Sequence, residues 1–143
     1  MYGKLLFLKK IMSQKVMSQS EVDALVLQKI SKHQASIVLD KEFFLDLLKH
    51  SLSLNVPEKQ RVIDSIPNLS QFQFDELIKV FLEERDKFRD LIKQHPDDIK
   101  KLLEKQKSEW IELGELYMIA EKTKKQEQED KAKIDDIKSQ LGL

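Results

Sequence analysis

The sequence of 143 residues contains no cysteine, and only three glycines and three prolines. Without cysteine the chain has no disulfides, thiolate zinc ligands or thiol nucleophiles, which fits a reducing compartment. The scarcity of glycine and proline argues against a β-rich fold, because such folds need turn residues about every 8–12 positions. We therefore expect an all-α protein of the cytoplasm.

The chain also lacks an excess charge and a long apolar run. Its 25 basic and 25 acidic residues balance, so no overall field attracts nucleic acid or an anionic membrane. The apolar run at 5–8 is too short for a signal-peptide core or a membrane span. Met12 and Met17 follow closely. We expect residues 1–17 to form a flexible tail, of which the first 11 would be untranslated if the chain starts at Met12.

Five segments combine a helix start signal with apolar residues at helical spacing. Ser18 and Ser70 each precede Glu or Gln by three positions, which is the spacing of a capping box. Asp40 is placed as an N-cap, while Pro57 and Pro96 suit a first helical turn. These signals predict helices at 19–33, 41–53, 57–66, 71–94 and 96–120.

The strongest apolar stripe belongs to the helix at 71–94, and a second stripe follows in 96–120. Only His95 and Pro96 separate the two helices. A connection this short joins antiparallel neighbours in helical bundles. We therefore expect these two helices to pack as an antiparallel pair, covered by the helices of 19–66.

The C-terminal segment differs in composition from the rest of the chain. Ala132 is the only apolar residue between 121 and 133, which is typical of a solvated helix or a disordered linker. Ile134, Ile137 and Leu141 then return at helical spacing. Along one unbroken helix they point more than about 90° away from the earlier stripe. We interpret these three residues as the binding site for a partner or a second copy, and Gly142 as the helix C-cap.

No pattern in the sequence indicates catalysis. His33, His50 and His95 never lie three or four positions apart, so they form no helical metal-binding pair. The paired carboxylates lie in charged stretches, without the apolar surroundings that raise a catalytic pKa. Three glycines provide no phosphate loop, dinucleotide fingerprint or nucleophile elbow. We expect no enzyme activity, no cofactor, no metal ion and no small-molecule ligand.

The tripeptide His95-Pro96-Asp97 is similar to that of the J-domain co-chaperones, in which it lies between two antiparallel helices. In that family a loop of several residues follows the tripeptide, whereas residues 98–106 favour helix here. We therefore interpret the tripeptide as a helix break followed by an acidic first turn, which complements the positive end of the helix dipole.

Together these features predict an all-α, irregular four- to five-helix bundle with a long, charged C-terminal helix. We expect a helical domain at 18–120 and a helical or partly disordered extension at 121–143. The favoured function is a non-enzymatic protein–protein interaction module, such as a scaffold, adaptor or assembly factor, with coiled-coil character. The alternative is a small nucleic-acid-binding regulator with a helix-turn-helix-like element at 41–66. Its basic residues are Lys41, Lys49, Lys59 and Arg61.

Overall fold

The computed structural model describes residues 17–143, of which 81% are helical, and this range contains five α-helices and no strand. The elements are α2 (Gln19–Ile30), α3 (Lys41–Lys49), α4 (Val56–Ser65), the 3-10 turn η1 (Ile66–Asn68), α5 (Gln71–Gln94) and α6 (Pro96–Gln140). The expected all-α bundle with a long C-terminal helix is confirmed. The hypothesis about residues 1–11 concerns a segment outside the described residues.

The helices begin where their capping residues predict. Ser18 and Ser70 form complete capping boxes, and Asn55 forms a third one at the start of α4. The side chain of Asp40 accepts a hydrogen bond from the backbone N–H of Phe43 at 3.2 Å. The helix ends agree less well, because α2 and α3 stop three and four residues before the predicted ends at 33 and 53. Capping chemistry therefore locates helix starts better than helix ends.

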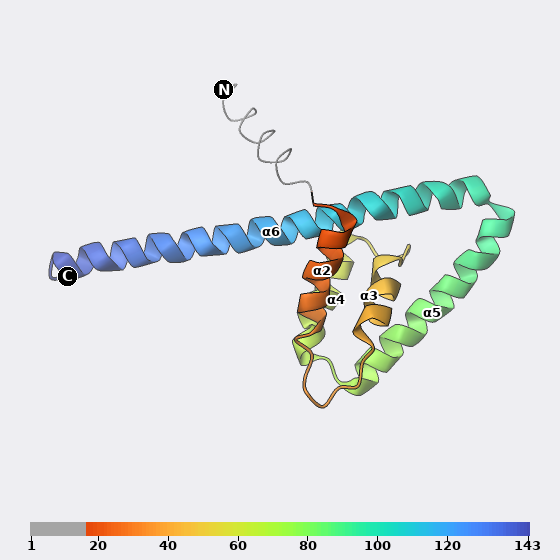
Figure 1. The fold of residues 1–143 in the computed structure, drawn as a ribbon, viewed down its shortest axis with the longest axis horizontal. Helices are drawn as coiled ribbons and strands as arrows, with labels where there is room; N and C mark the ends of the chain where they lie inside the picture. Colours follow the sequence, from red (N-terminus) through yellow and green to blue (C-terminus); the bar gives the residue numbers. More distant parts are fainter. Residues whose placement is uncertain (1–16) are drawn as a thin grey trace, which may run out of the picture.

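The expected antiparallel packing of the two long helices is wrong. Figure 1 shows that α5 and α6 diverge from the corner at His95, with α2, α3 and α4 in the space between them. The main contacts of the two long helices are with different short helices: α5 packs on α3, while α6 packs on α2 and α4. The short helices hold the two long helices apart beyond the corner, so the connection of one residue joins two sides of a triangle.

The core fills this triangle. On the α5 side, the ring of Phe44 meets the ring of Phe74 edge-on at 5.5 Å between centroids and that of Phe81 at 6.2 Å. On the α6 side, Trp110 and Leu113 are fully buried. Tyr117 of α6 also belongs to the core. The remaining core residues come from the short elements and the segments next to them: Met17, Val22, Val26, Ile30, Ile37, Leu45, Leu47, Leu48, Val56, Ile63 and Ile66.

The close contact between α2 and α6 depends on Gly114. A Cβ atom at this position would lie 2.5 Å from Cγ2 of Val22 and 3.2 Å from the sulfur of Met17. Val22 is fully buried and Met17 is 7% exposed. Met17 therefore belongs to the core, and the N-terminal tail expected at 1–17 ends at least one residue earlier.

We predict that Gly114→Ala destabilises the protein by about 1–3 kcal/mol, the usual cost of overpacking a core. This loss opposes the gain of roughly 1 kcal/mol that alanine brings to a helix interior. Thermal unfolding measures both. In a Val22→Ala background the same substitution should be neutral or stabilising, because the clashing methyl groups are gone. A higher melting temperature for Gly114→Ala alone would contradict the close packing of α2 on α6.

Candidate interaction surface

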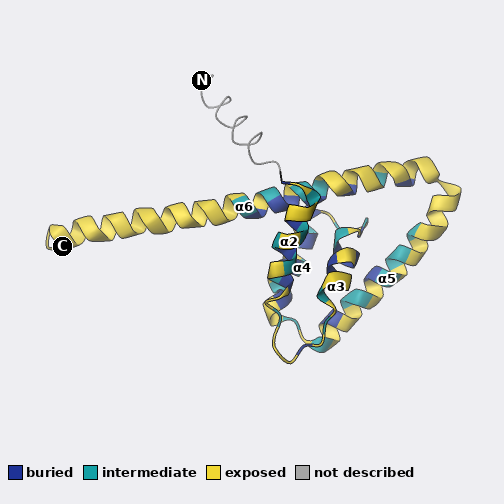
Figure 2. Ribbon diagram, in the orientation of Figure 1, coloured by how far each residue is buried: buried dark blue, intermediate teal, exposed yellow. Residues whose placement is uncertain are grey.

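Helix α6 passes through two environments. Its first half carries buried residues as far as Tyr117, whereas every residue from 119 to 143 is exposed. Figure 2 shows the change from buried to exposed along the single helix. The extension was expected to be helical or partly disordered. In the structure it is helical, and α6 continues without a break to Gln140.

Helix α6 ends at Gln140, and Gly142 lies just beyond it in the capping position that the sequence predicted. Gly142 has a φ angle of 73°, which glycine adopts without strain. The backbone N–H groups of Gly142 and Leu143 donate to the carbonyls of Ser139 and Lys138, at 3.2 and 2.9 Å. This pair of hydrogen bonds is a Schellman motif, so the last turn of the exposed helix is capped by its own backbone.

The three predicted binding residues share a face with two residues that the sequence analysis missed. Ile134, Ile137 and Leu141 are 53%, 55% and 68% exposed, and Leu116 and Ile119 are 40% and 56% exposed. Ile134 and Ile137 follow Leu116 and Ile119 by 18 positions each, which is five turns of helix and about 27 Å. The five side chains fall within about 60° of one another around α6. The spacing of 18 was visible in the sequence. We call these five residues the α6 face.

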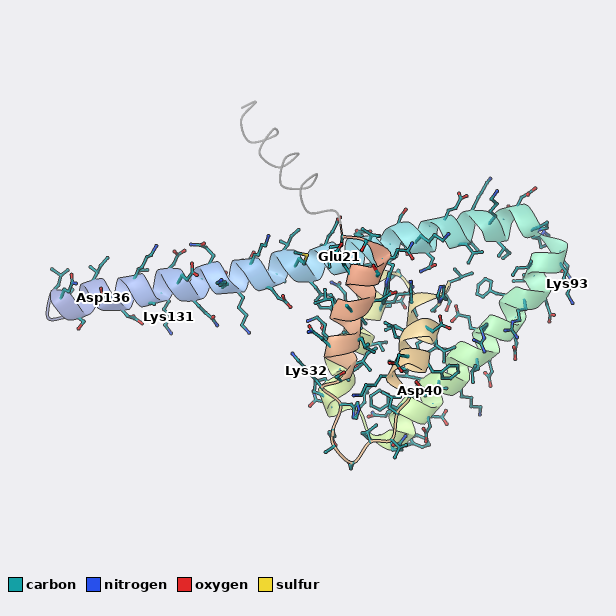
Figure 3. The ribbon with its side chains drawn as sticks, in the orientation of Figure 1. Glu21, Lys32, Asp40, Lys93, Lys131 and Asp136 are labelled. Atoms are coloured by element: carbon teal, nitrogen blue, oxygen red, sulfur yellow. The ribbon has the colours of Figure 1, made fainter. Side chains whose placement is uncertain are left out.

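The charges beside the α6 face are not symmetric. Lys124, Lys131 and Lys138 recur every seven residues along one flank. Figure 3 labels Lys131 and Asp136 near the end of the helix, where side chains leave it in all directions. In an antiparallel pair of two copies, the lysine flanks would meet each other. In a parallel pair, the lysine flank would meet a flank of mixed charge, which carries Lys133 and Lys122 as well as Glu115 and Glu129.

Two short polar contacts of α6, and a third that holds one of their acceptors, fix the rotation of α6 about its axis. Nε1 of Trp110 donates a hydrogen bond to Oδ1 of Asp23 at 2.8 Å. Nζ of Lys49 reaches the other oxygen of Asp23 at 3.1 Å. Further along α6, the hydroxyl of Tyr117 donates to Oδ1 of Asp64 at 2.8 Å. The buried aromatic residues therefore carry polar atoms that find partners in only one orientation of the helix.

Lys59 lies beside these contacts and is unexpectedly buried. The residue is 2% exposed, although lysine is rarely buried. Nζ of Lys59 donates to the carbonyl of Lys49 at 3.0 Å and lies 5.9 Å from the ring centroid of Trp110. Burial lowers the pKa of Lys59 from 10.5 to about 8, although the charges of Glu109 and Glu84 act in the opposite direction. The chain thus holds a lysine ammonium under partial desolvation at neutral pH.

We predict that the protein becomes more stable as the pH rises from about 8 to 10. Between the folded and unfolded pKa of Lys59 the unfolded state binds the extra proton, so the free energy of unfolding increases with pH. The increase should be on the order of 2 kcal/mol. Above pH 10 the gain reverses. Burial, and to a smaller extent Asp64, raises the pKa of Tyr117 above its usual range. The unfolded state therefore loses the phenol proton at a lower pH than the folded state does, and the free energy of unfolding falls. Thermal unfolding against pH measures the trend.

Lys59→Met should remove the rise, while Lys32→Met, which changes an exposed lysine of the loop after α2, should keep it. If the wild type and Lys59→Met respond to pH in the same way between 8 and 10, Lys59 is not the cause.

The basic residues of the expected helix-turn-helix-like element are partly used inside the protein. Lys49 binds Asp23 and Lys59 is buried. Lys41 and Arg61 are the two that remain available to a phosphate backbone. Since phosphate contacts supply most of the affinity for nucleic acid, the structure adds no support to this alternative.

The other sequence features do not converge on a reaction site. Within residues 17–143, no group of three or more histidine or acidic side chains is arranged to hold a metal ion. In the same range, none of the helices has an apolar stretch of the length that a membrane span requires. His95 lies at the corner between α5 and α6.

No protein-family model matches the chain, and no curated protein and no solved structure is similar to it. Its function therefore has to be inferred from its own residues.

Proposed function

We propose that the chain is a non-enzymatic protein–protein interaction module of the cytoplasm, and that it binds its partner through the α6 face. The proposal rests on one observation: α6 continues, with every residue exposed, from residue 119 to its end at Gln140. In proteins, helices gain most of their stability from packing of an apolar face and less from propensity. A surface helix that presents its own apolar side chains beyond the domain is suited to a second macromolecule.

The size of the α6 face sets the expected strength of binding. Each of its five side chains is roughly half exposed, so a partner would bury the remaining half of each. At about 1.5–3 kcal/mol for a whole side chain, this contributes about 4–8 kcal/mol in total. Association costs offset part of that gain. We therefore expect a reversible complex that is tightened by polar contacts at the flanks.

The flanks favour a partner of different sequence over a second copy. A helix whose apolar stripe is flanked by acidic residues would pair with Lys124, Lys131 and Lys138, as e and g positions do in coiled coils. Two copies of this chain would offer those lysines either the same lysines or a flank of mixed charge. The proposed complex is a short coiled coil between α6 and an acidic amphipathic helix of another protein.

We predict that the double variant Ile134→Asp with Ile137→Asp loses its partner without losing stability. Two new charges on the α6 face would have to be desolvated on binding, which is costly. Affinity capture with the full chain from its native host, followed by mass spectrometry, should recover a protein that the double variant fails to retain. Light scattering on the same samples reports self-association.

Ala132→Asp is the matched control, because Ala132 lies on the opposite side of the exposed helix, about 160° from the α6 face. This variant should bind as the wild type does. A chain that ends at Lys122 should also lose the partner while its melting temperature changes little. A fall of more than about 8 °C, which means well over 1 kcal/mol for a protein of this size, would show that the extension stabilises the domain and would contradict the proposal.

A further inference from the structure

A cavity of about 340 Å³ lies inside the corner where α5 ends and α6 begins. It lies where the two long helices diverge from the corner (Figure 1), and residues from the end of α3 line it together with residues of α5 and α6. Its apolar walls come from three helices: Leu47, Phe81, Phe88, Ile92, Ile99 and Leu103. Ligand sites in helical bundles have this location, size and apolar lining.

Arg85 is the charged group of this cavity that lacks a partner. Its Nε atom is buried and has no hydrogen-bond partner among residues 17–143. None of the ion pairs in that range includes it. A buried polar atom without a partner costs free energy, and a guanidinium offers five donors that suit a carboxylate. Because Nε has almost no accessible surface, a ligand would meet the two terminal nitrogens of Arg85, which keep accessible surface and form no ion pair within the described range. The cavity therefore combines apolar walls with donors for an anion.

The acidic residues beside Arg85 are already engaged. The carboxylate of Glu84 accepts hydrogen bonds from the backbone N–H groups of Leu52 and Ser53, both at 2.8 Å, and from the hydroxyl of Ser51. Asp46 pairs with Nδ1 of His50 at 3.0 Å. Both carboxylates therefore have other partners and neither forms an ion pair with Arg85, so a ligand can supply the missing anion.

The volume limits the size of the ligand. At about 30 Å³ for each non-hydrogen atom, the share of a water molecule in the liquid, the cavity holds roughly ten such atoms. We propose that this cavity binds a small monocarboxylate with a medium-length aliphatic chain, its carboxylate on Arg85 and its chain between α5 and α6. The sequence analysis indicated no small-molecule ligand, because the walls of the cavity come from segments far apart in the chain.

The test is a titration of the full chain with octanoate, followed by amide chemical shifts in NMR spectra. Shifts should change first at cavity residues such as Leu47, Phe88 and Leu103. Arg85→Met keeps the apolar stem and removes the charge, and should weaken octanoate binding about tenfold or more. Arg61→Met, the matched control on α4, should bind octanoate as the wild type does. Octanol, which has no charge, should bind equally to the wild type and to Arg85→Met.

Leu103→Trp should block both ligands by filling the cavity. Three results would overturn the proposal: no shift changes at millimolar octanoate, changes confined to the α6 face, or equal octanoate affinity of the wild type and Arg85→Met. The variant with Ile134→Asp and Ile137→Asp should still bind octanoate, so failure of the cavity and failure of the α6 face are distinguishable.

Discussion

The carboxylate of Asp23 is the contact on which the arrangement of the helices depends. From α2 it accepts the indole N–H of Trp110 on α6 and the ammonium of Lys49 on α3. Trp110 is fully buried, and its donor would be left without a partner if α6 turned about its axis. Because α6 is one continuous helix, the rotation fixed at Trp110 also fixes the direction of every side chain that follows. The α6 face is exposed for this reason: it lies more than 100° around the helix from Trp110.

The approach of α6 to the short helices is set in the same region. Gly114 lets the backbone of α6 lie against Val22, one turn beyond the contact of Trp110 with Asp23. One turn further, Tyr117 reaches Asp64 on α4. The close contact at Gly114 thus lies between the hydrogen bonds made by Trp110 and Tyr117. Packing at Gly114 sets the distance between the helices, and the hydrogen bonds on either side set their angle and rotation. Together they make α6 a rigid support for its own extension.

The sequence predicted those features that depend on neighbouring residues. Capping boxes located the starts of α2 and α5, and helical spacing placed Ile134, Ile137 and Leu141 outside the main stripe. The features it missed depend on contacts between distant segments. The pairing of α5 with α6 was predicted from their short connection, but the three short helices occupy the space that this pairing would need. Buried Lys59 gave no local signal, because its carbonyl partner and its aromatic neighbour lie ten and 51 positions away.

The two surfaces proposed for binding are two of the places where this small domain leaves apolar groups incompletely covered, and their shapes differ. The α6 face is convex and spans more than 27 Å by the helix rise, so only another extended element can cover it. The cavity at the corner is concave and holds roughly ten non-hydrogen atoms, which suits a small molecule. Both use α6, but the cavity uses Ile99 and Leu103 near its start and on the side of Trp110. Since the two sites share neither residues nor a side of the helix, substitutions in one leave the contacts of the other intact.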